Sequence, residues 1–136
     1  MKIMIDTNVI ISSLIKQGSV PDIVLNYVCY NHDLVLCDQI INECYIVAKR
    51  RFPDKIDVLS NFFAQMKYKL VTAPGTEESK IIDVKDQNIL NAAIANNVKI
   101  LISGDKHFLE LDLDAPQITN PSEFKRLYID SQTPST

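Results

Sequence analysis

The stretch Lys2-Ile3-Met4-Ile5-Asp6-Thr7-Asn8 decides the fold of this chain. Its three consecutive apolar residues are typical of a short strand that is buried on both faces, as in a parallel sheet. The apolar run ends on the carboxylate of Asp6. Ile100-Leu101-Ile102-Ser103-Gly104-Asp105 repeats the arrangement, with an apolar run that again leads to an acid. Because ligands bind outside the carboxyl ends of the strands in open α/β sheets, we expect Asp6 and Asp105 to meet at one edge.

The composition is that of a soluble globular domain, with 136 residues, 46% of them hydrophobic and 23% charged. We therefore expect one domain over residues 1–130 and a disordered polar tail over 131–136. A net charge of −3 does not attract nucleic acid, so such binding would need local basic patches or a metal ion. No apolar run reaches the length of a membrane span. The three cysteines lie in apolar segments without metal-type spacing, which indicates reduced thiols and a cytoplasmic location.

Strand-like and helical segments alternate along the whole chain. Further strands are expected at 34–37, 69–72, 99–103 and 117–119. Helices are expected at 9–15 (capped by Thr7 or Asn8), 20–28, 39–51 (capped by Asp38), 56–66, 86–97, 107–111 and from Pro121, with a loop at 74–80. The alternation predicts a three-layer α/β/α, Rossmann-like fold around a central, mostly parallel sheet of about five strands.

Two further acids lie near the beginning of predicted helices. Asp86 shares a helical face with Leu90 and Ala93, so its carboxylate is expected to point inward rather than to solvent. Glu43 lies about 100° from the centre of an apolar helical face, from where it can lean over the edge of the sheet. Taken singly, each of these acids is explained as well by helix capping or by exposure to solvent.

Taken together, the four acids Asp6, Glu43, Asp86 and Asp105 require one explanation. Clustered carboxylates repel one another, and they ionise together only when cations neutralise them. Ligand sets made of oxygen atoms select hard ions such as Mg²⁺ or Mn²⁺. We therefore predict that these acids bind one of these ions and catalyse phosphodiester hydrolysis by metal-activated water.

Residues near the four acids have weaker predicted roles. Asn8 and Ser103 can position a carboxylate or a water by hydrogen bonding, and Asp83 is expected to cap a helix or support a ligand. His107, two residues after Asp105, could approach a substrate, but the sequence shows no partner for it, and a position at the surface is expected.

Three cations are candidates for contacts with substrate phosphates, namely Lys49, Arg50 and Lys106. Lys106 lies closest in sequence to one of the acids. Lys49 and Arg50 lie at the end of a predicted helix, where cations also serve as partners of the helix dipole. The sequence does not distinguish between a contact with a substrate phosphate and an interaction with the helix dipole for Lys49 and Arg50.

The order and spacing of the acids resemble those of the PIN domain nucleases over residues 2–128. The resemblance is carried by Asp6-Thr7-Asn8, by Glu43, by Asp86-Gln87-Asn88-Ile89-Leu90 before Ala92-Ala93, and by Ser103-Gly104-Asp105-Lys106. Within the family, the chain looks most like the toxin-like proteins of prokaryotic toxin–antitoxin modules. The resemblance implies a Mg²⁺- or Mn²⁺-dependent endoribonuclease that forms a homodimer and is inhibited by an antitoxin. Ser103 stands where relatives more often have Thr, and Gln87 where many have another acid.

Two alternatives remain open at this stage, a catalytically silent PIN-like binding module and another Rossmann-like metal-dependent phosphohydrolase. A phosphohydrolase with an aspartyl nucleophile needs a second Asp two residues after the first, where this chain has Asn8. A phospho-acceptor receiver domain would need paired acids after the first strand and an acceptor Asp after the third, and neither is evident. The presence of all four acids argues against a silent module but does not prove turnover.

Overall fold

The structure is a computed structural model, and it describes residues 1–72 and 84–132. In chain order its elements are β1 (Lys2–Ile5), α1 (Thr7–Ile15), α2 (Val20–Asn31), β2 (Asp33–Cys37), α3 (Asp38–Arg51), the 3-10 helix η1 (Pro53–Lys55), α4 (Ile56–Gln65), β3 (Lys69–Val71), α5 (Val84–Ala95), β4 (Ile100–Ile102), α6 (Lys106–Leu109), β5 (Gln117–Thr119), α7 (Pro121–Phe124), the π-helix η2 (Lys125–Ile129) and the 3-10 helix η3 (Asp130–Gln132).

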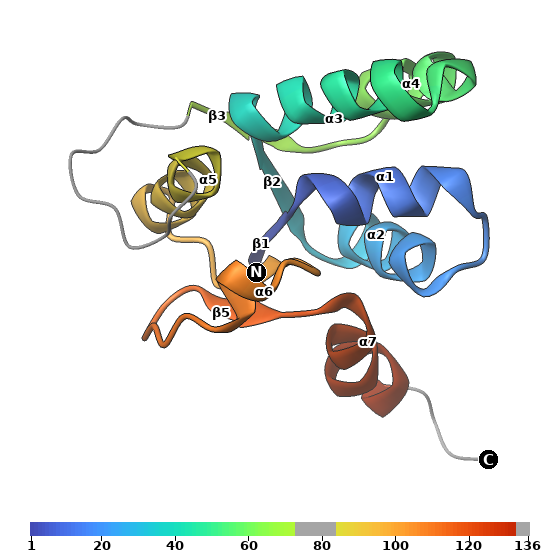
Figure 1. Cartoon of the computed structure of the whole chain (residues 1–136). Helices are drawn as coiled ribbons and strands as arrows, with labels where there is room; N and C mark the ends of the chain where they lie inside the picture. The colour runs from blue at the N-terminus through green and yellow to red at the C-terminus, as the bar shows by residue number, and fades with distance from the viewer. Residues whose placement is uncertain (73–83, 133–136) are drawn as a thin grey trace.

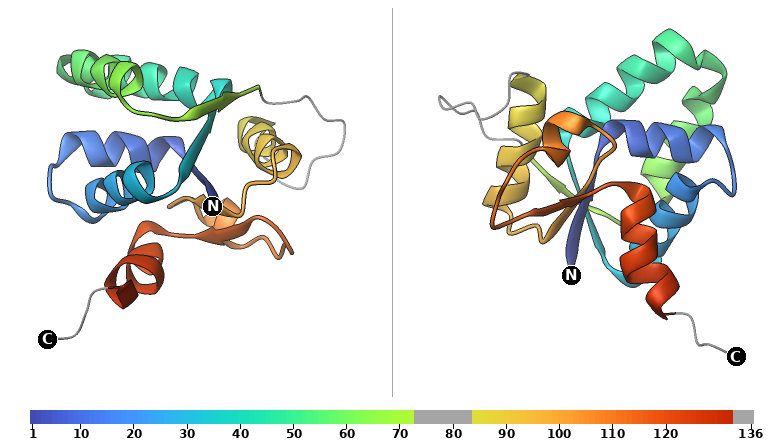
Figure 2. Two further views of the ribbon diagram at one scale, coloured as in Figure 1. Left: turned by 180° about the vertical axis from the view of Figure 1, so that it is seen from behind. Right: turned by 60° about the horizontal axis from the view of Figure 1, so that its bottom comes forward.

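The five strands form one parallel sheet in the order β3-β2-β1-β4-β5. Figures 1 and 2 show α1, α2 and α7 on one face of the sheet and α5 on the other, so the predicted three-layer α/β/α fold is confirmed. Crossovers between parallel strands are right-handed, and the connection from β3 to β4 runs back across the sheet, which places its helix on the opposite face. Successive strands are therefore added on one side of β1 up to β3 and on its other side from β4 onward. In sheets of this kind, ligands bind at this switch point between β1 and β4.

The central strands are buried on both faces, as their uninterrupted apolar runs predict. Ile3, Met4, Ile5 and Leu101 are fully buried. Burying one large aliphatic side chain contributes about 1.5–3 kcal/mol to stability, so each short strand is firmly anchored in the core. This anchoring also fixes the residues that directly follow the strands.

The register places the ends of β1 and β4 side by side. Ile5 pairs with Ile102, and the backbone N–H of Asp6 donates a hydrogen bond to the Ile102 carbonyl at 2.9 Å. Asp6 and Ser103 are 97 positions apart in the sequence, and they leave the sheet next to each other. The two stretches that the sequence singled out are thus neighbours in space.

Two predicted helix caps are wrong. Asp6, rather than Thr7 or Asn8, caps α1, because its carboxylate accepts a hydrogen bond from the Thr7 N–H at 2.8 Å. Asp38 is the first residue of α3 and not its cap; the residue before it, Cys37, makes no capping hydrogen bond through its side chain. In both places the helix begins one or two residues earlier than expected, directly where the preceding strand ends.

The helix predicted over 86–97 runs from Val84 to Ala95, two residues earlier at each end. Asn97 adopts a left-handed φ of 58°, a conformation that cannot continue a right-handed helix. None of the helices in the described parts of the chain is both long and apolar enough to cross a membrane.

Near the C-terminus, Asn120 caps α7, since its side-chain oxygen accepts a hydrogen bond from the Glu123 N–H at 2.7 Å. Ser131 and Gln132, the first residues of the predicted tail, belong to η3. Residues 133–136 and the predicted loop 74–80 lie outside the described residues.

Candidate functional site

An open cavity of about 400 Å³ has Asp6, Glu43, Asp86 and Asp105 in its wall. Asp6 and Asp105 directly precede α1 and α6, Glu43 lies in α3 and Asp86 in the first turn of α5. The cavity is also lined by Thr7, Asn8, Ile46, Val47, Arg50, Lys85 and His107. The fold therefore gathers the four predicted acids, which come from four separate segments, around one polar hollow.

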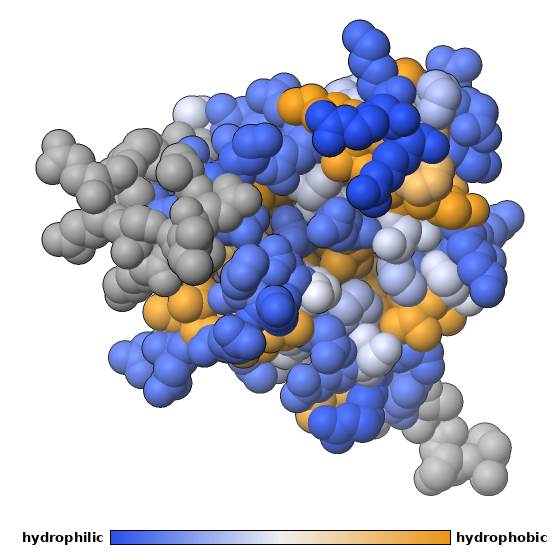
Figure 3. Space-filling model, in the orientation of Figure 1, coloured by the Kyte–Doolittle hydropathy of each residue, from blue (hydrophilic) through white to orange (hydrophobic). Residues whose placement is uncertain are grey.

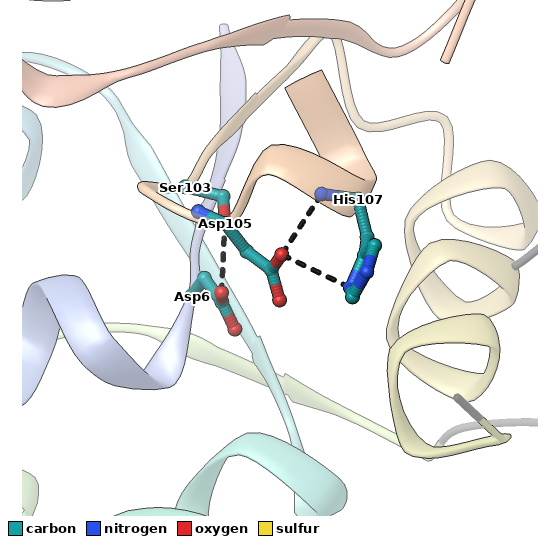
Figure 4. Close-up of polar contacts among 4 residues, drawn as sticks. All are labelled: Asp6, Ser103, Asp105 and His107. Atoms are coloured by element: carbon teal, nitrogen blue, oxygen red, sulfur yellow. Dashed lines mark hydrogen bonds and ion pairs between the residues drawn. The ribbon is translucent and has the colours of Figure 1, made fainter. Parts of the chain in front are cut away.

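A hydrogen-bonded chain links the ends of β1 and β4. The hydroxyl of Ser103, which is fully buried, donates to Asp6 Oδ2 at 2.9 Å. The same hydroxyl accepts a hydrogen bond from the Asp105 N–H at 3.0 Å. Figure 4 shows the Ser103 hydroxyl joined to the Asp6 carboxylate below it, with the Asp105 side chain alongside. Ser103 therefore supports Asp6 directly and holds the backbone of Asp105 in place.

Glu43 is held on α3 by two neutral donors. Thr7 Oγ1 donates to Glu43 Oε2 at 3.0 Å, and the Gln39 side-chain amide donates to Oε1 at 3.3 Å. Thr7 follows Asp6 at the beginning of α1, so the Thr7 hydroxyl connects this helix with α3 beside the cavity. Glu43 is half-buried and turned toward the other acids rather than fully into solvent.

His107 is exposed, as expected, and it also lies against one of the predicted acids. Its Nδ1 lies 3.3 Å from Asp105 Oδ1, and its backbone N–H donates to the same oxygen at 2.9 Å. One ligand atom from each of Asp86, Asp105 and His107 lies within 4.8 Å of the others. The Asp-x-His spacing was the available signal, because the residue two positions after an N-cap donates its N–H to the cap and is held beside it.

Burial raises the pKa of Asp6 to about 6, from an ordinary value of 3.8, because only 4% of this residue is exposed and its charge is poorly solvated. Hydrogen bonds from Ser103 and the Thr7 N–H lower the pKa, whereas the negative charges of Glu43 and Asp105 raise it. Desolvation dominates the balance. A carboxylate in these surroundings gains from a neighbouring cation, which offsets both the desolvation and the repulsion.

The donor set fits a hard divalent cation. Within residues 1–72 and 84–132, Asp6 and Glu43 accept hydrogen bonds from neutral groups alone, and no lysine or arginine forms an ion pair with either. Negative charge therefore accumulates in the cavity without a matching charge beside these two acids. Carboxylate oxygens around an open position are the ligands that Mg²⁺ and Mn²⁺ prefer.

The other predicted site residues are placed differently. Asn8 is exposed and lines the cavity, as does Arg50 in the last turn of α3. Lys49 and Lys106 are exposed and do not belong to the cavity wall, so their contact with a substrate stays a prediction. Asp83 lies outside the described residues. Lys85, which the sequence did not single out, is a further cation in the wall.

A thiol nucleophile is disfavoured at every cysteine. Cys29, Cys37 and Cys44 are free, and none of them lines the cavity. Burial raises the pKa of Cys29 and of Cys37 to about 11, and it raises the pKa of Cys44 further. Because the thiolate is the reactive form, these thiols are inert at neutral pH.

The raised pKa of Asp6 predicts a pH-dependent stability difference between the wild type and Asp6→Asn, measured by urea unfolding in EDTA. The folded state favours protonated Asp6. The contribution of Asp6 to the stability of the wild type is therefore present below pH 4 and is lost as the pH rises through 6. Asparagine mimics the protonated acid and is an equally good helix cap. Between pH 4 and pH 7.5, the free energy of unfolding of Asp6→Asn should rise relative to that of the wild type by about 2–3 kcal/mol. Asp57→Asn, at an exposed position in α4, should give no such trend, and a constant difference for Asp6→Asn would contradict the raised pKa.

Comparison with known proteins identifies a PIN domain over residues 2–107, a range that contains all four acids. Eleven chains of solved structures match this chain. One belongs to the crystal structure of VapBC2 from Rickettsia felis bound to a DNA fragment from its promoter; the TM-score is 0.66 at 18% identity, over 88% of this chain and 98% of that chain. No curated protein matches the chain. At this identity the structural likeness concerns the fold, and the domain match identifies the family. The chain belongs to the PIN domain family of nucleases.

Proposed function

We propose that this protein is a divalent-metal-dependent endoribonuclease that hydrolyses RNA phosphodiester bonds. The observation that carries the proposal is the convergence of Asp6, Glu43, Asp86 and Asp105 on one open cavity that also has Arg50 in its wall. Membership of the PIN domain family supports action on nucleic acid. The resemblance of the four motifs to toxin-like PIN proteins supports RNA as the substrate.

In this proposal the four acids hold Mg²⁺ or Mn²⁺. When bound, such an ion lowers the pKa of a water molecule and neutralises the charge that develops on the phosphate oxygens. The chain itself supplies the alignment. Ser103 and the Thr7 N–H orient Asp6, while Thr7 Oγ1 and Gln39 orient Glu43. Carboxylates that are held in advance need little rearrangement when a substrate arrives, which lowers the barrier to reaction.

Arg50 is the best-placed side chain for a substrate phosphate. It is exposed in the last turn of α3 and lines the same cavity as the acids. A guanidinium group can donate two parallel hydrogen bonds to a phosphate, which fixes its orientation as well as its position. Lys49 and Lys106 are proposed as further contacts outside the cavity. With so few cations and a net charge of −3, RNA binding should depend mainly on the metal and weakly on salt.

We further propose that the nuclease is the toxin of a cytoplasmic toxin–antitoxin module. The structurally similar chain belongs to VapBC2, a complex that was solved bound to DNA from its own promoter, which supports an antitoxin partner.

Figure 3 shows hydrophobic side chains at the upper right, where α3 and α4 lie, and Ile46 and Val58 in these helices are 50% and 41% exposed. Exposed apolar side chains of this kind suit a second copy of the chain or an antitoxin. Phe62, which also belongs to α4, is buried in the core and does not contribute to this surface.

Cleavage of total cellular RNA by the purified protein in Mg²⁺, in Mn²⁺ and in EDTA tests the proposal. We expect cleavage with either ion and none in EDTA, because the carboxylates alone cannot activate water. A DNA strand of the same sequence as a cleaved RNA should stay intact. Cleavage that persists in EDTA would contradict the metal-dependent reaction. A folded protein that cleaves no RNA with either ion would favour the silent binding module.

A further inference from the structure

We infer that His107 is a ligand of the metal ion, together with Asp86 and Asp105, and that its nitrogen makes the site favour Mn²⁺ over Mg²⁺. This inference rests on the proposed function, because it requires a cation among the carboxylates. It assigns to His107 a role beyond its contact with the helix cap Asp105.

The first argument is distance. One ligand atom of each of Asp86, Asp105 and His107 lies within 4.8 Å of the other two. An ion with ligands at about 2.2 Å reaches donors up to about 4.4 Å apart on opposite sides, so small side-chain movements are enough. The His107 side chain is 46% exposed and therefore has room to adjust. Its Nδ1 is 3.3 Å from Asp105 Oδ1, close to the separation of about 3 Å between neighbouring ligands of an octahedral ion.

The second argument is the way the backbone holds the imidazole. Asp105 caps α6 by accepting the His107 N–H, and its own N–H donates to the buried Ser103 hydroxyl. His107 is therefore tied to the end of β4 through two hydrogen bonds. Figure 4 shows the imidazole ring between Asp105 and the pale yellow helix α5, the helix that carries Asp86. A side chain placed at random on the surface would have no reason to lie within 4.8 Å of two of the predicted acids.

The third argument is chemical selection. Mg²⁺ takes oxygen ligands almost exclusively. Mn²⁺ also prefers oxygen ligands, but as a transition-metal ion it accepts an imidazole nitrogen more readily than Mg²⁺ does. A donor set of carboxylates alone would favour neither ion strongly. Adding one imidazole should shift the preference toward Mn²⁺, and removing it should weaken Mn²⁺ binding more than Mg²⁺ binding.

The competing explanation is that His107 is a cation and forms an ion pair with Asp105. Exposed pairs of this kind stabilise a protein only weakly, and this one would leave the metal with oxygen ligands alone. An imidazolium has no lone pair for a metal. The two explanations therefore differ in one observable, a direct bond between the ion and nitrogen.

Electron spin-echo envelope modulation of bound Mn²⁺ measures that bond, because coordinated imidazole nitrogen modulates the echo. The chain has two histidines, and the other one, His32, lines a different cavity. We expect nitrogen modulation in the wild type and in the control His32→Gln, and its loss in His107→Gln. His107→Gln should still bind Mn²⁺ through the acids, with an affinity lowered about tenfold, while its Mg²⁺ affinity changes less than about twofold.

Each other outcome overturns the inference. Bound Mn²⁺ without nitrogen modulation in the wild type would assign His107 to the ion pair and leave the proposed nuclease intact. The same holds if modulation persists in His107→Gln. Failure of the wild type to bind Mn²⁺ or Mg²⁺ at millimolar concentration would instead overturn the proposed function, and the inference with it.

Discussion

Asp86→Asn is expected to lower the rate of RNA cleavage at saturating Mg²⁺ by at least about a thousandfold. Asp86 lies in the first turn of α5 and lines the cavity with the other three acids. Asparagine keeps the size of the side chain but removes one of the negative charges that hold the cation and the water. The loss should appear in kcat, measured in single-turnover assays, because alignment is needed most in the transition state.

Two control measurements test whether the loss of activity is specific to the Asp86 carboxylate. The free energy of unfolding of Asp86→Asn in EDTA should stay within about 1 kcal/mol of the wild type, which excludes loss of the fold as the cause. Asp57→Asn, an equally conservative change at an exposed position in α4, should cleave RNA at the wild-type rate. If Asp86→Asn keeps a tenth or more of the wild-type cleavage rate, the Asp86 carboxylate stabilises the N-terminus of α5 and takes no part in the reaction.

Saturating Mg²⁺ or Mn²⁺ is expected to raise the melting temperature of the wild type by on the order of 10 °C. A ligand at a hundred times its Kd stabilises the folded state by about 2.7 kcal/mol, and the gain includes relief of the repulsion among the four carboxylates. Asp6 should contribute strongly, since its pKa of about 6 shows how poorly its charge is compensated without an ion. Thermal melts in EDTA and in millimolar metal at constant ionic strength measure the shift.

Asp6→Asn and Asp105→Asn should reduce that shift, because each removes an acid that lines the cavity. Asp57→Asn should melt like the wild type in both buffers. A sodium salt at the same ionic strength serves as the control for screening, which acts on all charges alike. Identical melting curves of the wild type with and without metal would argue strongly against a cation site at these acids.

Much of the layout of the candidate site could be predicted from the sequence, because it follows from where the strands end. Two uninterrupted apolar runs, each followed by an acid, predicted Asp6 and Asp105 at one edge, and parallel pairing of Ile5 with Ile102 brings them there. The period of the helices placed Glu43 and Asp86 on faces directed at the same edge. These predictions depend on the alternation of side chains over a few residues, which is a local property.

Local sequence patterns did not predict the contacts that a side chain makes with distant parts of the chain. Asp6 was predicted as a metal ligand at the end of a strand, and its carboxylate also caps α1 and accepts a hydrogen bond from the Ser103 hydroxyl. His107 is exposed as expected, but its contact with Asp105 and its closeness to Asp86 were not predicted, because they depend on the turn at the beginning of α6 and on the position of α5. Contacts of this kind depend on distances across the sheet, and no period of the sequence encodes them.

The sequence by itself determined the elements, the three-layer class and the identity of the four acids, because burial of apolar side chains in short strands and amphipathic helices is a local pattern. Only the tertiary structure decided the strand order β3-β2-β1-β4-β5 and hence which strand ends are neighbours. It also decided that Arg50 and His107 line the cavity while Lys106, next to a site acid in sequence, does not. The physical reason is that charge and hydrogen bonding act through space, so the partners of a carboxylate are set by packing and not by separation along the chain.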